Sequence, residues 1–311
     1  MSDRPSKALY LQLHLLVILL ASTAVLGRMI TLSAPALVWW RTALAAPVAL
    51  LLVGVVFRRR VLPPGAQLVK VLGIGMIVGL HWMCFFGAIR IANISICLAG
   101  MATISFFTAF TEPLMERRRI RRVEVWLGLL VLLGIVLVAG FEQGRLLGLG
   151  VALLGAMLAA VFPVFNQHMV RQEGMDPLVM VGWEMVGACF VCVIGLRVFD
   201  GPGAYTALFQ LRGLDWLWLL LLAWVCTVFA HAFHIHLLRH LSAYTGNLAM
   251  NCEPVYGITA AALLFGEHQV LHPGFYVGAA TIVIANILHP LLLHRAHRRR
   301  IRYAQGGPKP R

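Results

Sequence analysis

The chain has 311 residues, of which 60% are apolar and only 12% are charged, and its formal net charge is +14. Soluble globular domains carry about 45–50% apolar and about 25% charged residues, so this composition argues against a water-soluble globule and against a disordered chain. The basic residues stand in short bursts between apolar runs rather than on one face, which argues against a nucleic-acid-binding module and is typical of a multi-pass membrane protein.

Ten apolar stretches have the length of a membrane-spanning helix, which needs about 20 mostly apolar residues. In chain order they are residues 8–27, 33–56, 67–89, 93–114, 123–141, 148–170, 176–197, 216–238, 242–265 and 270–292. The first has a basic flank like that of a signal peptide, but no clean small-residue cleavage site precedes the second, so we expect it to be retained. The loops between the stretches are too short for a soluble domain.

The distribution of Lys and Arg predicts the orientation of the chain. Twenty of them fall in loops and tails on the side of the N-terminus and five on the opposite side, while Arg41 lies within a span. Cytoplasmic loops carry an excess of Lys and Arg, so we expect a multi-pass protein of the cytoplasmic (inner) membrane with both termini in the cytoplasm. The basic tail at residues 293–311 is expected to lie against anionic headgroups.

The two halves of the chain show faint self-similarity. The second and seventh spans begin with Pro35 and Pro177, and each carries a Trp followed by a charged residue about two turns later, which is Arg41 in one and Glu184 in the other. Five spans per half is an odd number, so two similar halves must insert in opposite directions. We therefore predict an all-α integral membrane protein in which ten transmembrane helices form two inverted five-helix repeats.

Three stretches of the sequence resemble the EamA family of the drug/metabolite transporter (DMT) superfamily. They are Asn251-Cys-Glu253-Pro254-Val-Tyr256-Gly257 with Leu-Leu-Phe-Gly266-Glu267, Trp40-Arg41-Thr-Ala-Leu-Ala, and His81-Trp82 to Ala88-Ile-Arg90. The resemblance implies two inverted units with a cavity between them, and export or exchange of small metabolites. On it we expect EamA-like repeats at residues 8–142 (spans one to five) and 146–292 (spans six to ten). The helix proline that the family has in the first half falls near Thr103 here, a departure from the pattern.

Glu253 is the leading candidate for the transport pathway. It lies about eleven residues into the ninth span, close to mid-depth, where an ionisable side chain costs about 2.5–3.5 kcal/mol and is a functional candidate. Pro254 has no N–H group, so it frees the carbonyl of Met250 and is expected to break or bend the helix. A carboxylate at such a break can hold a cation, a substrate amine or a coupling proton. The alternative, that Glu253 only caps backbone at a close helix contact, stays open.

Arg41 and Glu184 are a second pair of candidates. Each lies about eight residues into its span, or about 12 Å deep at 1.5 Å per residue. In a hydrocarbon core about 30 Å thick, the two approach the midplane from opposite sides. They could therefore pair across the two halves, either within the pathway or as a structural ion pair.

The other candidate pathway residues are aromatic or polar side chains within the spans. They are His81, Trp82, His231, His234, Asn251 and Tyr256. His231 and His234 share one face of the eighth span, and with Glu253 they could form a metal site or a proton relay; plain packing is the alternative. We expect no catalytic residue, resident metal or cofactor, because no H-E-x-x-H, G-x-S-x-G or phosphate-binding loop occurs.

Small residues and cysteines inside the spans indicate packing. Gly75-x-x-x-Gly79 in the third span predicts a close helix contact. All six cysteines lie in apolar runs, so we expect no disulfide framework. Cys189-x-x-Cys192 is interpreted as packing rather than redox or metal chemistry.

These observations predict a secondary transporter and not an enzyme. The expected activity is export of a small metabolite, an amino acid or a related amphiphile, by alternating access. The expected partners are that substrate, the lipid bilayer and, in one version, a coupling proton, with no nucleic acid. The alternatives are a metal- or proton-linked cation transporter that uses the His231/His234/Glu253 region, an integral-membrane enzyme, and a non-transporting membrane protein.

Overall fold

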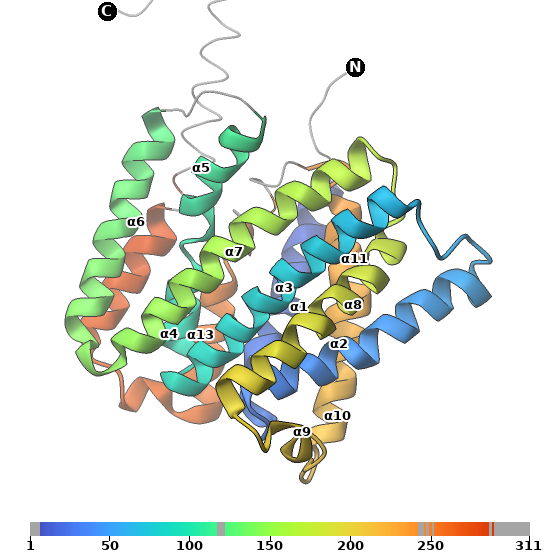
Figure 1. Cartoon of the computed structure of the whole chain (residues 1–311). Coiled ribbons are helices and arrows are strands. Elements are labelled where there is room, and N and C mark those ends of the chain that lie inside the picture. Colours follow the sequence, from blue (N-terminus) through green and yellow to red (C-terminus); the bar gives the residue numbers. More distant parts are fainter. Residues whose placement is uncertain are drawn as a thin grey trace, which may run out of the picture.

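The computed structural model describes residues 7–116, 122–241, 246, 249–250, 252–285 and 288, and over these residues it is helical, without strands (Figure 1). Up to residue 141 the elements are α1 (Lys7–Met29), α2 (Ala34–Leu51), η1 (Leu52–Val56), α3 (Gly65–Ile91), α4 (Ile94–Met101), α5 (Ile104–Glu116) and α6 (Arg122–Phe141). They are followed by η2 (Gln143–Arg145), α7 (Leu146–Arg171), α8 (Pro177–Gly195), η3 (Leu196–Asp200), α9 (Ala204–Ala207), α10 (Asp215–Leu220), η4 (Leu221–Phe229), α11 (Ala230–Leu237), α13 (Glu253–Phe265) and η5 (Glu267–Gln269). A further helix covers Pro273–Ala285.

Among the described residues, seven helical stretches are long and apolar enough to cross a membrane, by length and composition. Shorter apolar helices occupy three more of the predicted spans, at Trp126–Phe141, Glu253–Phe265 and Pro273–Ala285. The structure is therefore that of a multi-pass helical membrane protein, whereas the count of ten spans stays a prediction. The basic tail at residues 293–311 lies outside the described residues.

Three predicted spans are interrupted within their length, rather than only at one end. The fourth is divided between α4 and α5, where the Thr103 hydroxyl donates to the carbonyl oxygen of Gly100 (2.7 Å). In the eighth, the nine-residue π-helix η4 stands between α10 and α11. In the ninth, α13 begins only at Glu253. Breaks and π-turns of this kind cost regular hydrogen bonding, and they are frequent at functional sites.

The helices α2 and α8 begin and end alike. Ser33 and Asp176 cap them by accepting backbone N–H groups of the first turn, at 3.4 and 2.9 Å. Pro35 and Pro177 follow in the first turn, where a missing N–H costs nothing. Each helix then passes into a π-turn, η1 after α2 and η3 after α8. The start of α8 at Pro177 is as the sequence predicts.

The central helix α3 packs between α7 and α8 (Figure 1). A Cβ atom at Gly75 would lie only 2.0 Å from the carbonyl oxygen of Glu184, and one at Gly79 would lie 2.9 Å from the Cα of Ala188. The absence of side chains at these two positions lets the backbones of α3 and α8 approach. The close contact predicted from Gly75-x-x-x-Gly79 is confirmed.

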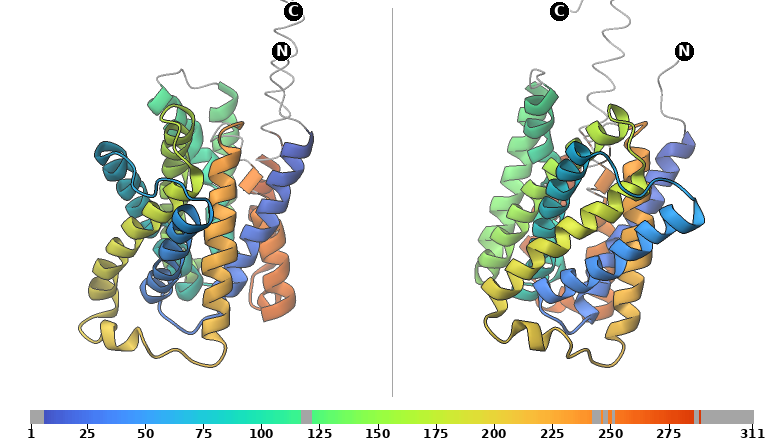
Figure 2. Two further views of the ribbon diagram at one scale, coloured as in Figure 1. Left: turned by 90° about the vertical axis from the view of Figure 1, so that its right-hand side faces the viewer. Right: turned by 45° about the vertical axis from the view of Figure 1, so that its right-hand side comes forward.

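Helices from the beginning and the end of the chain lie side by side. Helix α1 contacts η4, α11 and α13, and it runs beside the long helix that η4 and α11 form (Figure 2). Helix α6 meets the helix Pro273–Ala285 where both carry glycine: a Cβ atom at Gly134 would lie 2.9 Å from the carbonyl oxygen of Gly278. The bundle is thus closed by contacts between segments far apart in sequence.

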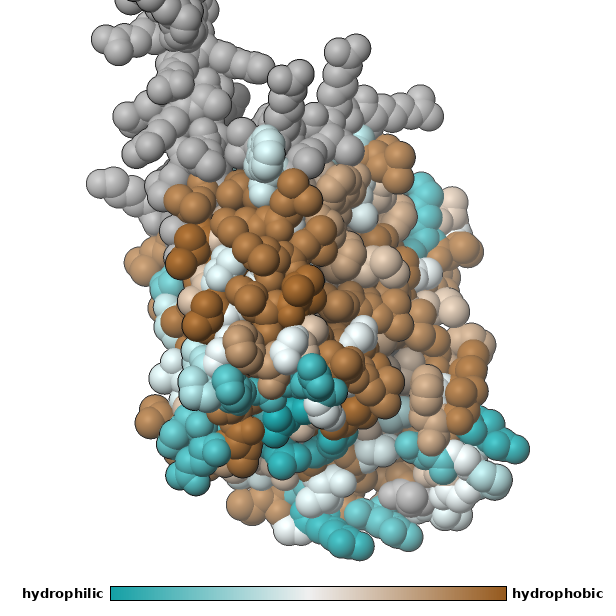
Figure 3. Space-filling view, turned by 90° about the vertical axis from the view of Figure 1, so that its left-hand side faces the viewer, coloured by the Kyte–Doolittle hydropathy of each residue, from teal (hydrophilic) through white to brown (hydrophobic). Residues whose placement is uncertain are grey.

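The outer face that carries α6 is apolar over most of its height (Figure 3). On α6, Trp126 and Val136 are 73% and 66% exposed, and α13 exposes Leu263 and Leu264 in the same way. Contiguous exposed apolar surface indicates contact with lipid or with another protein. On a chain with seven candidate spans, the lipid bilayer accounts for it.

Candidate central cavity

A central cavity of about 100 Å³ lies between helices from both halves of the chain. Its lining residues are Leu20, Thr23, Arg41, His81, Trp82, Phe85, Met101, Ile104, Ala159, Phe162, Pro163, Cys226, His231, His234, Met250 and Glu253. They come from α1 to α5, from α7, η4, α11 and α13, and from Met250 just before α13. Six pathway residues that the sequence predicts are brought together here, namely Arg41, His81, Trp82, His231, His234 and Glu253.

Arg41 is buried and is held against η4. Its Nε donates to Thr227 Oγ1 (2.6 Å) and its Nη2 donates to the carbonyl oxygen of Cys226 (3.2 Å). The guanidinium carbon lies 3.6 Å from the centroid of the Trp82 ring, a geometry in which the ring face attracts the cation. The charge of Arg41 is thus accommodated by a π-helix and an aromatic face. The sequence gives no sign of the Thr227 contact, because it depends on how α2 docks on η4.

Glu184 pairs with His231 and not with Arg41. Glu184 Oε2 lies 2.6 Å from His231 Nε2, and Glu184 is fully buried behind the cavity wall. The prediction that Arg41 and Glu184 pair is therefore wrong. The reason is the packing: α8 contacts α11, which carries His231, while α2 contacts η4. Glu184 itself does not line the cavity.

Aromatic rings form one wall of the cavity. The ring of His231 lies edge-on to Trp82 and to Phe162, at centroid distances of 6.0 and 6.1 Å. His81 packs against Phe162 at 5.6 Å, and its Nδ1 donates to the carbonyl oxygen of Gly155 (2.9 Å). Because a carbonyl oxygen only accepts hydrogen bonds, this contact puts a proton on His81 Nδ1. The ring is fixed in orientation with its other edge available to the cavity.

Glu253 stands at the first residue of α13 and is half-buried beside the cavity. The sequence predicts that Pro254 breaks or bends the ninth span; in the structure α13 starts here, with Pro254 in its first turn. Before it, Cys252 N–H donates to the carbonyl oxygen of Ala249 (3.0 Å) as a turn. A carboxylate at a helix N-terminus is favoured by the helix dipole. The candidate Asn251 lies outside the described residues.

Tyr256 is placed away from the cavity. Its hydroxyl lies 2.5 Å from His14 Nε2, and this contact ties α13 to α1.

His234 does line the cavity, and its Nε2 is buried without a hydrogen-bond partner in the described part of the chain. Within that part, no three His, Cys, Asp or Glu side chains are grouped to hold a metal ion. The alternative prediction of a metal site formed by His231, His234 and Glu253 is therefore wrong. The ring of His231 is instead hydrogen-bonded to Glu184.

Two glutamates outside the predicted site hold helix ends across the chain. Glu267, after α13, accepts hydrogen bonds from the N–H groups of Ile94 (3.0 Å) and Ser95 (2.9 Å) at the start of α4. Glu142, after α6, accepts one from the N–H of His272 (2.7 Å), just before the helix Pro273–Ala285. Both carboxylates are buried, and in the sequence each follows an apolar span; Glu267 also ends one of the stretches that resemble the EamA family. Glu267 thereby anchors α4, which lines the cavity through Met101, and Glu142 anchors the helix Pro273–Ala285.

Comparison with known proteins finds a family match in the second half of the chain. A family model described as the EamA-like transporter family matches residues 146–289. A solved crystal structure shares the fold with a TM-score of 0.65 at 16% sequence identity, and the match covers 92% of this chain and 98% of the other. At that identity the likeness shows a common fold alone. No curated protein matches the chain by sequence. The protein is thus a multi-pass helical membrane protein with an EamA-like transporter family domain at residues 146–289.

Proposed function

We propose that the protein is a secondary transporter that exports a small metabolite, an amino acid or a related amphiphile, across the cytoplasmic membrane by alternating access. The observation that carries this proposal is the central cavity, which both halves of the chain line and where Arg41, His231 and Glu253 meet. Ionisable side chains at membrane depth are costly and mark substrate or ion pathways. A cavity between two halves is also where transporters of this type bind their substrates.

The proposed topology has ten spans in two inverted repeats, at residues 8–142 and 146–292, with both termini and the 293–311 tail in the cytoplasm. The likeness of α2 and α8 supports it, because both have a capped, proline-containing first turn and both end in a π-turn. Both also carry the Trp–charged pair about two turns in. Two halves with corresponding second helices and an odd number of spans must run in opposite directions.

The two helix breaks support the same assignment. One divides α4 from α5 in the first half, and the other precedes α13 in the second. Both reach the cavity, the first through Met101 and Ile104 and the second through Met250 and Glu253. Discontinuous helices at the midplane present backbone groups to substrate or ions in many transporters. The break at Thr103 stands where the first half lacks the family's proline.

The lining residues favour a substrate that carries charges of both signs and an apolar part. Arg41 suits a carboxylate, Glu253 suits an amine, and Trp82 with Phe85 and Phe162 suits an apolar group. The cavity of about 100 Å³ is smaller than the roughly 300–1,000 Å³ of small-molecule sites. Helices must therefore separate to admit such a substrate, as alternating access requires.

One observation favours proton coupling as a second component. The Glu184–His231 hydrogen bond stands at the cavity wall, between two groups that can exchange a proton. On this version, proton movement through His231 drives export, and Glu184→Gln flattens the dependence of flux on an imposed pH gradient.

Flux measurements on the purified protein in proteoliposomes test the proposal. A panel of amino acids and amphiphilic amines is loaded inside, and release of each compound is followed. We expect release of at least one compound, and a fall of about tenfold or more, equivalent to 1.4 kcal/mol, in Glu253→Gln and in Arg41→Lys. Arg41→Lys keeps the charge but loses the stacked, planar geometry. The matched control is Glu173→Gln, at a half-buried carboxylate that does not line the central cavity.

Two results would overturn the proposal. One is the absence of translocation of every compound by the unmodified protein in sealed vesicles. The other is transport by Glu253→Gln and Arg41→Lys at the rate of Glu173→Gln, since the cavity would then not be the pathway. Chemical conversion of a compound without its movement would instead indicate a membrane enzyme.

A further inference from the structure

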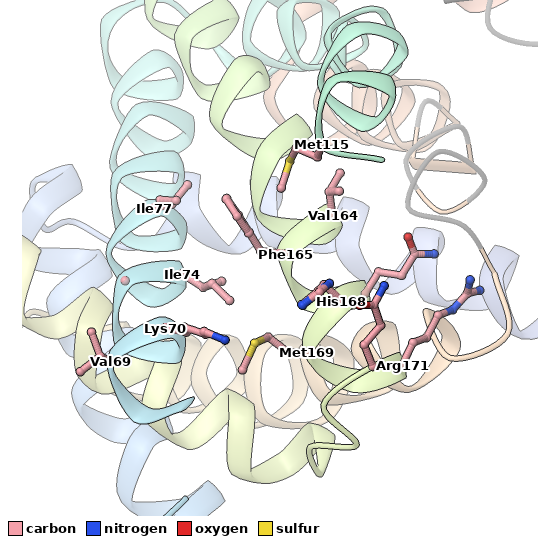
Figure 4. Close-up of a pocket in the computed structure, with 13 residues that line it drawn as sticks. Val69, Lys70, Ile74, Ile77, Met115, Val164, Phe165, His168, Met169 and Arg171 are labelled. Carbon is pink, nitrogen blue, oxygen red and sulfur yellow. The ribbon is translucent and has the colours of Figure 1, made fainter. Parts of the chain in front are cut away.

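A second and larger cavity, of about 610 Å³, lies between α3 and α7 and reaches the end of α5 (Figure 4). We call it the α3–α7 groove; its lining residues are Val69, Lys70, Gly73, Ile74, Ile77, Met115, Val164, Phe165, Gln167, His168, Met169, Arg171 and Gln172. None of them lines the central cavity. Nothing in the proposed transport function uses this groove.

The groove opens on the outside of the bundle. On α7 it is lined by Phe165 and His168, whereas Phe162 and Pro163 of the same helix line the central cavity. At 3.6 residues per turn, Phe165 is rotated about 200° from Pro163. Phe165 is 38% exposed, and on α3 the groove residue Val69 is 71% exposed. The groove therefore faces the surroundings of the helix bundle rather than its interior.

The charged side chains gather toward one end of the groove, beside Val69 and Met169 (Figure 4). Lys70, His168 and Arg171 stand toward one end, and Ile77 and Phe165 extend from α3 and α7 toward the other (Figure 4). The basic end lies near the start of α3 and the end of α7, the end of these helices that the Lys and Arg distribution predicts to lie at the membrane surface. From Lys70 to Ile77 the groove follows α3 for seven residues, about 10 Å at 1.5 Å per residue.

The charged rim retains donors for an anion. Lys70 donates to Glu173 Oε1 (2.7 Å), and this hydrogen bond lowers the pKa of Glu173, so the carboxylate is ionised at neutral pH. Arg171 uses Nε to donate to the carbonyl oxygen of Leu238 (2.8 Å). A lysine has three N–H donors and an arginine five. Two cations against one carboxylate leave the rim with an excess of one positive charge, before any charge on His168.

We infer that the α3–α7 groove binds an anionic phospholipid of the adjoining leaflet, with its phosphate between Lys70 and Arg171 and an acyl chain along Ile77 and Phe165. An outward, apolar trough at membrane depth fits an acyl chain, and the basic rim at the surface fits a headgroup phosphate. Basic pockets between transmembrane helices on the cytoplasmic side bind such headgroups. The Lys and Arg distribution predicts that this end of the molecule is cytoplasmic.

Substitution at Gly73 provides the most selective test. A Cβ atom at Gly73 would meet no atom within 4 Å, so Gly73→Leu fills the groove without disturbing the helix contacts. Its matched control is Gly150→Leu on α7, where a Cβ atom also meets nothing within 4 Å and which lies outside the groove. The charge test is the double variant K70Q/R171Q, with Arg59→Gln as control for loss of an exposed charge outside the groove.

Native mass spectrometry of the full-length protein, extracted from bilayers that contain phosphatidylglycerol and phosphatidylcholine, counts the retained lipids. We expect one phosphatidylglycerol per chain to be retained selectively. Its retention should fall about tenfold or more in Gly73→Leu and in K70Q/R171Q, as expected for loss of the groove or of two lipid-facing charges. The two control variants should retain it as the unmodified protein does.

Three outcomes would overturn the inference. Equal retention of phosphatidylcholine would show that the groove does not select an anion. Unchanged phosphatidylglycerol retention in Gly73→Leu would show that the lipid sits elsewhere, and this variant decides the matter even where K70Q/R171Q fails to fold. Displacement of the lipid by millimolar inorganic phosphate, with phosphate bound equally well by Gly73→Leu, would indicate a free-anion site.

Discussion

Glu184 Oε2 and His231 Nε2 are 2.6 Å apart, although 47 positions separate the two residues along the chain. Glu184 comes from α8 and is fully buried, whereas His231 comes from α11 and lines the central cavity. The other carboxylate oxygen, Oε1, has no hydrogen-bond partner in the described residues. Glu184 therefore acts on the cavity through His231, whose ring orientation it fixes.

The stability of the pair depends on keeping both partners able to hydrogen-bond. We expect Glu184→Ala to lower the free energy of unfolding by about 1–3 kcal/mol, because it leaves buried His231 without its partner. Glu184→Gln keeps the volume and a hydrogen-bonding group, so its loss should be smaller. Thermal unfolding of both variants in the same detergent measures the difference. Equal midpoints for the Ala and Gln variants would contradict this account of the contact.

The stacking of Arg41 on Trp82 predicts a graded series. Trp82→Leu removes the ring face and should cost about 0.5–2 kcal/mol of stability, while Trp82→Phe keeps a weaker aromatic partner and should cost less. Thermal unfolding gives the stability, and the apparent KM for a transported compound reports on the cavity wall. The matched control is Trp126→Leu, at a side chain that is 73% exposed on the outer face. A Trp82→Leu variant as stable as Trp126→Leu would show that the stacking contributes nothing.

The approach of α3 to α8 predicts opposite outcomes at two neighbouring glycines. A methyl group at Gly75 would lie 2.0 Å from the carbonyl oxygen of Glu184, so Gly75→Ala forces the helices apart and should cost about 1–3 kcal/mol. Gly73→Ala meets no neighbour within 4 Å and should gain about 0.5–1 kcal/mol in a helix interior. The unfolding midpoints of the two variants measure these changes in stability. A Gly75→Ala protein as stable as Gly73→Ala would contradict the close approach of α3 to α8 at Gly75.

Because Gly75 contacts the backbone of Glu184, the same variant should also affect transport. Moving α8 away from α3 displaces Glu184 from His231, so the flux of Gly75→Ala per folded molecule should fall. Gly73→Ala should transport at the rate of the unmodified protein. A fall in both variants alike would assign the effect to helix flexibility rather than to the displaced pair.

The cap that Glu267 provides for α4 predicts a purely structural effect. Glu267→Gln weakens the hydrogen bonds from two backbone N–H groups and from the Ser95 hydroxyl. A hydrogen bond to a charged acceptor contributes about 1.5–3 kcal/mol to the free energy of unfolding. We expect a lower unfolding midpoint, with unchanged apparent KM in the folded fraction. Glu173→Gln, at a half-buried carboxylate that caps no part of α4, serves as the control. A changed KM with an unchanged midpoint would place Glu267 in the pathway instead.

Residue order alone determined the class of protein and the places where helices form. Runs of about 20 apolar residues must be helical in a bilayer, because every backbone polar group there needs an internal partner. The start of the seventh span at Pro177 and the close contact at Gly75 and Gly79 could be predicted because they depend on neighbours along one helix or on the size of one side chain. The gathering of ionisable residues in spans likewise predicted where a pathway would run.

Only the tertiary structure decided which of those residues meet. The sequence predicts equal depth for Arg41 and Glu184, yet the docking of α2 on η4 and of α8 on α11 gives each a different partner, Thr227 and His231. Tyr256 shares its helix with Glu253, yet it faces α1 and His14. Side-chain pairing across a bundle depends on the rotation of every helix about its axis. That rotation is fixed by the packing of all helices together, which no local stretch of sequence records.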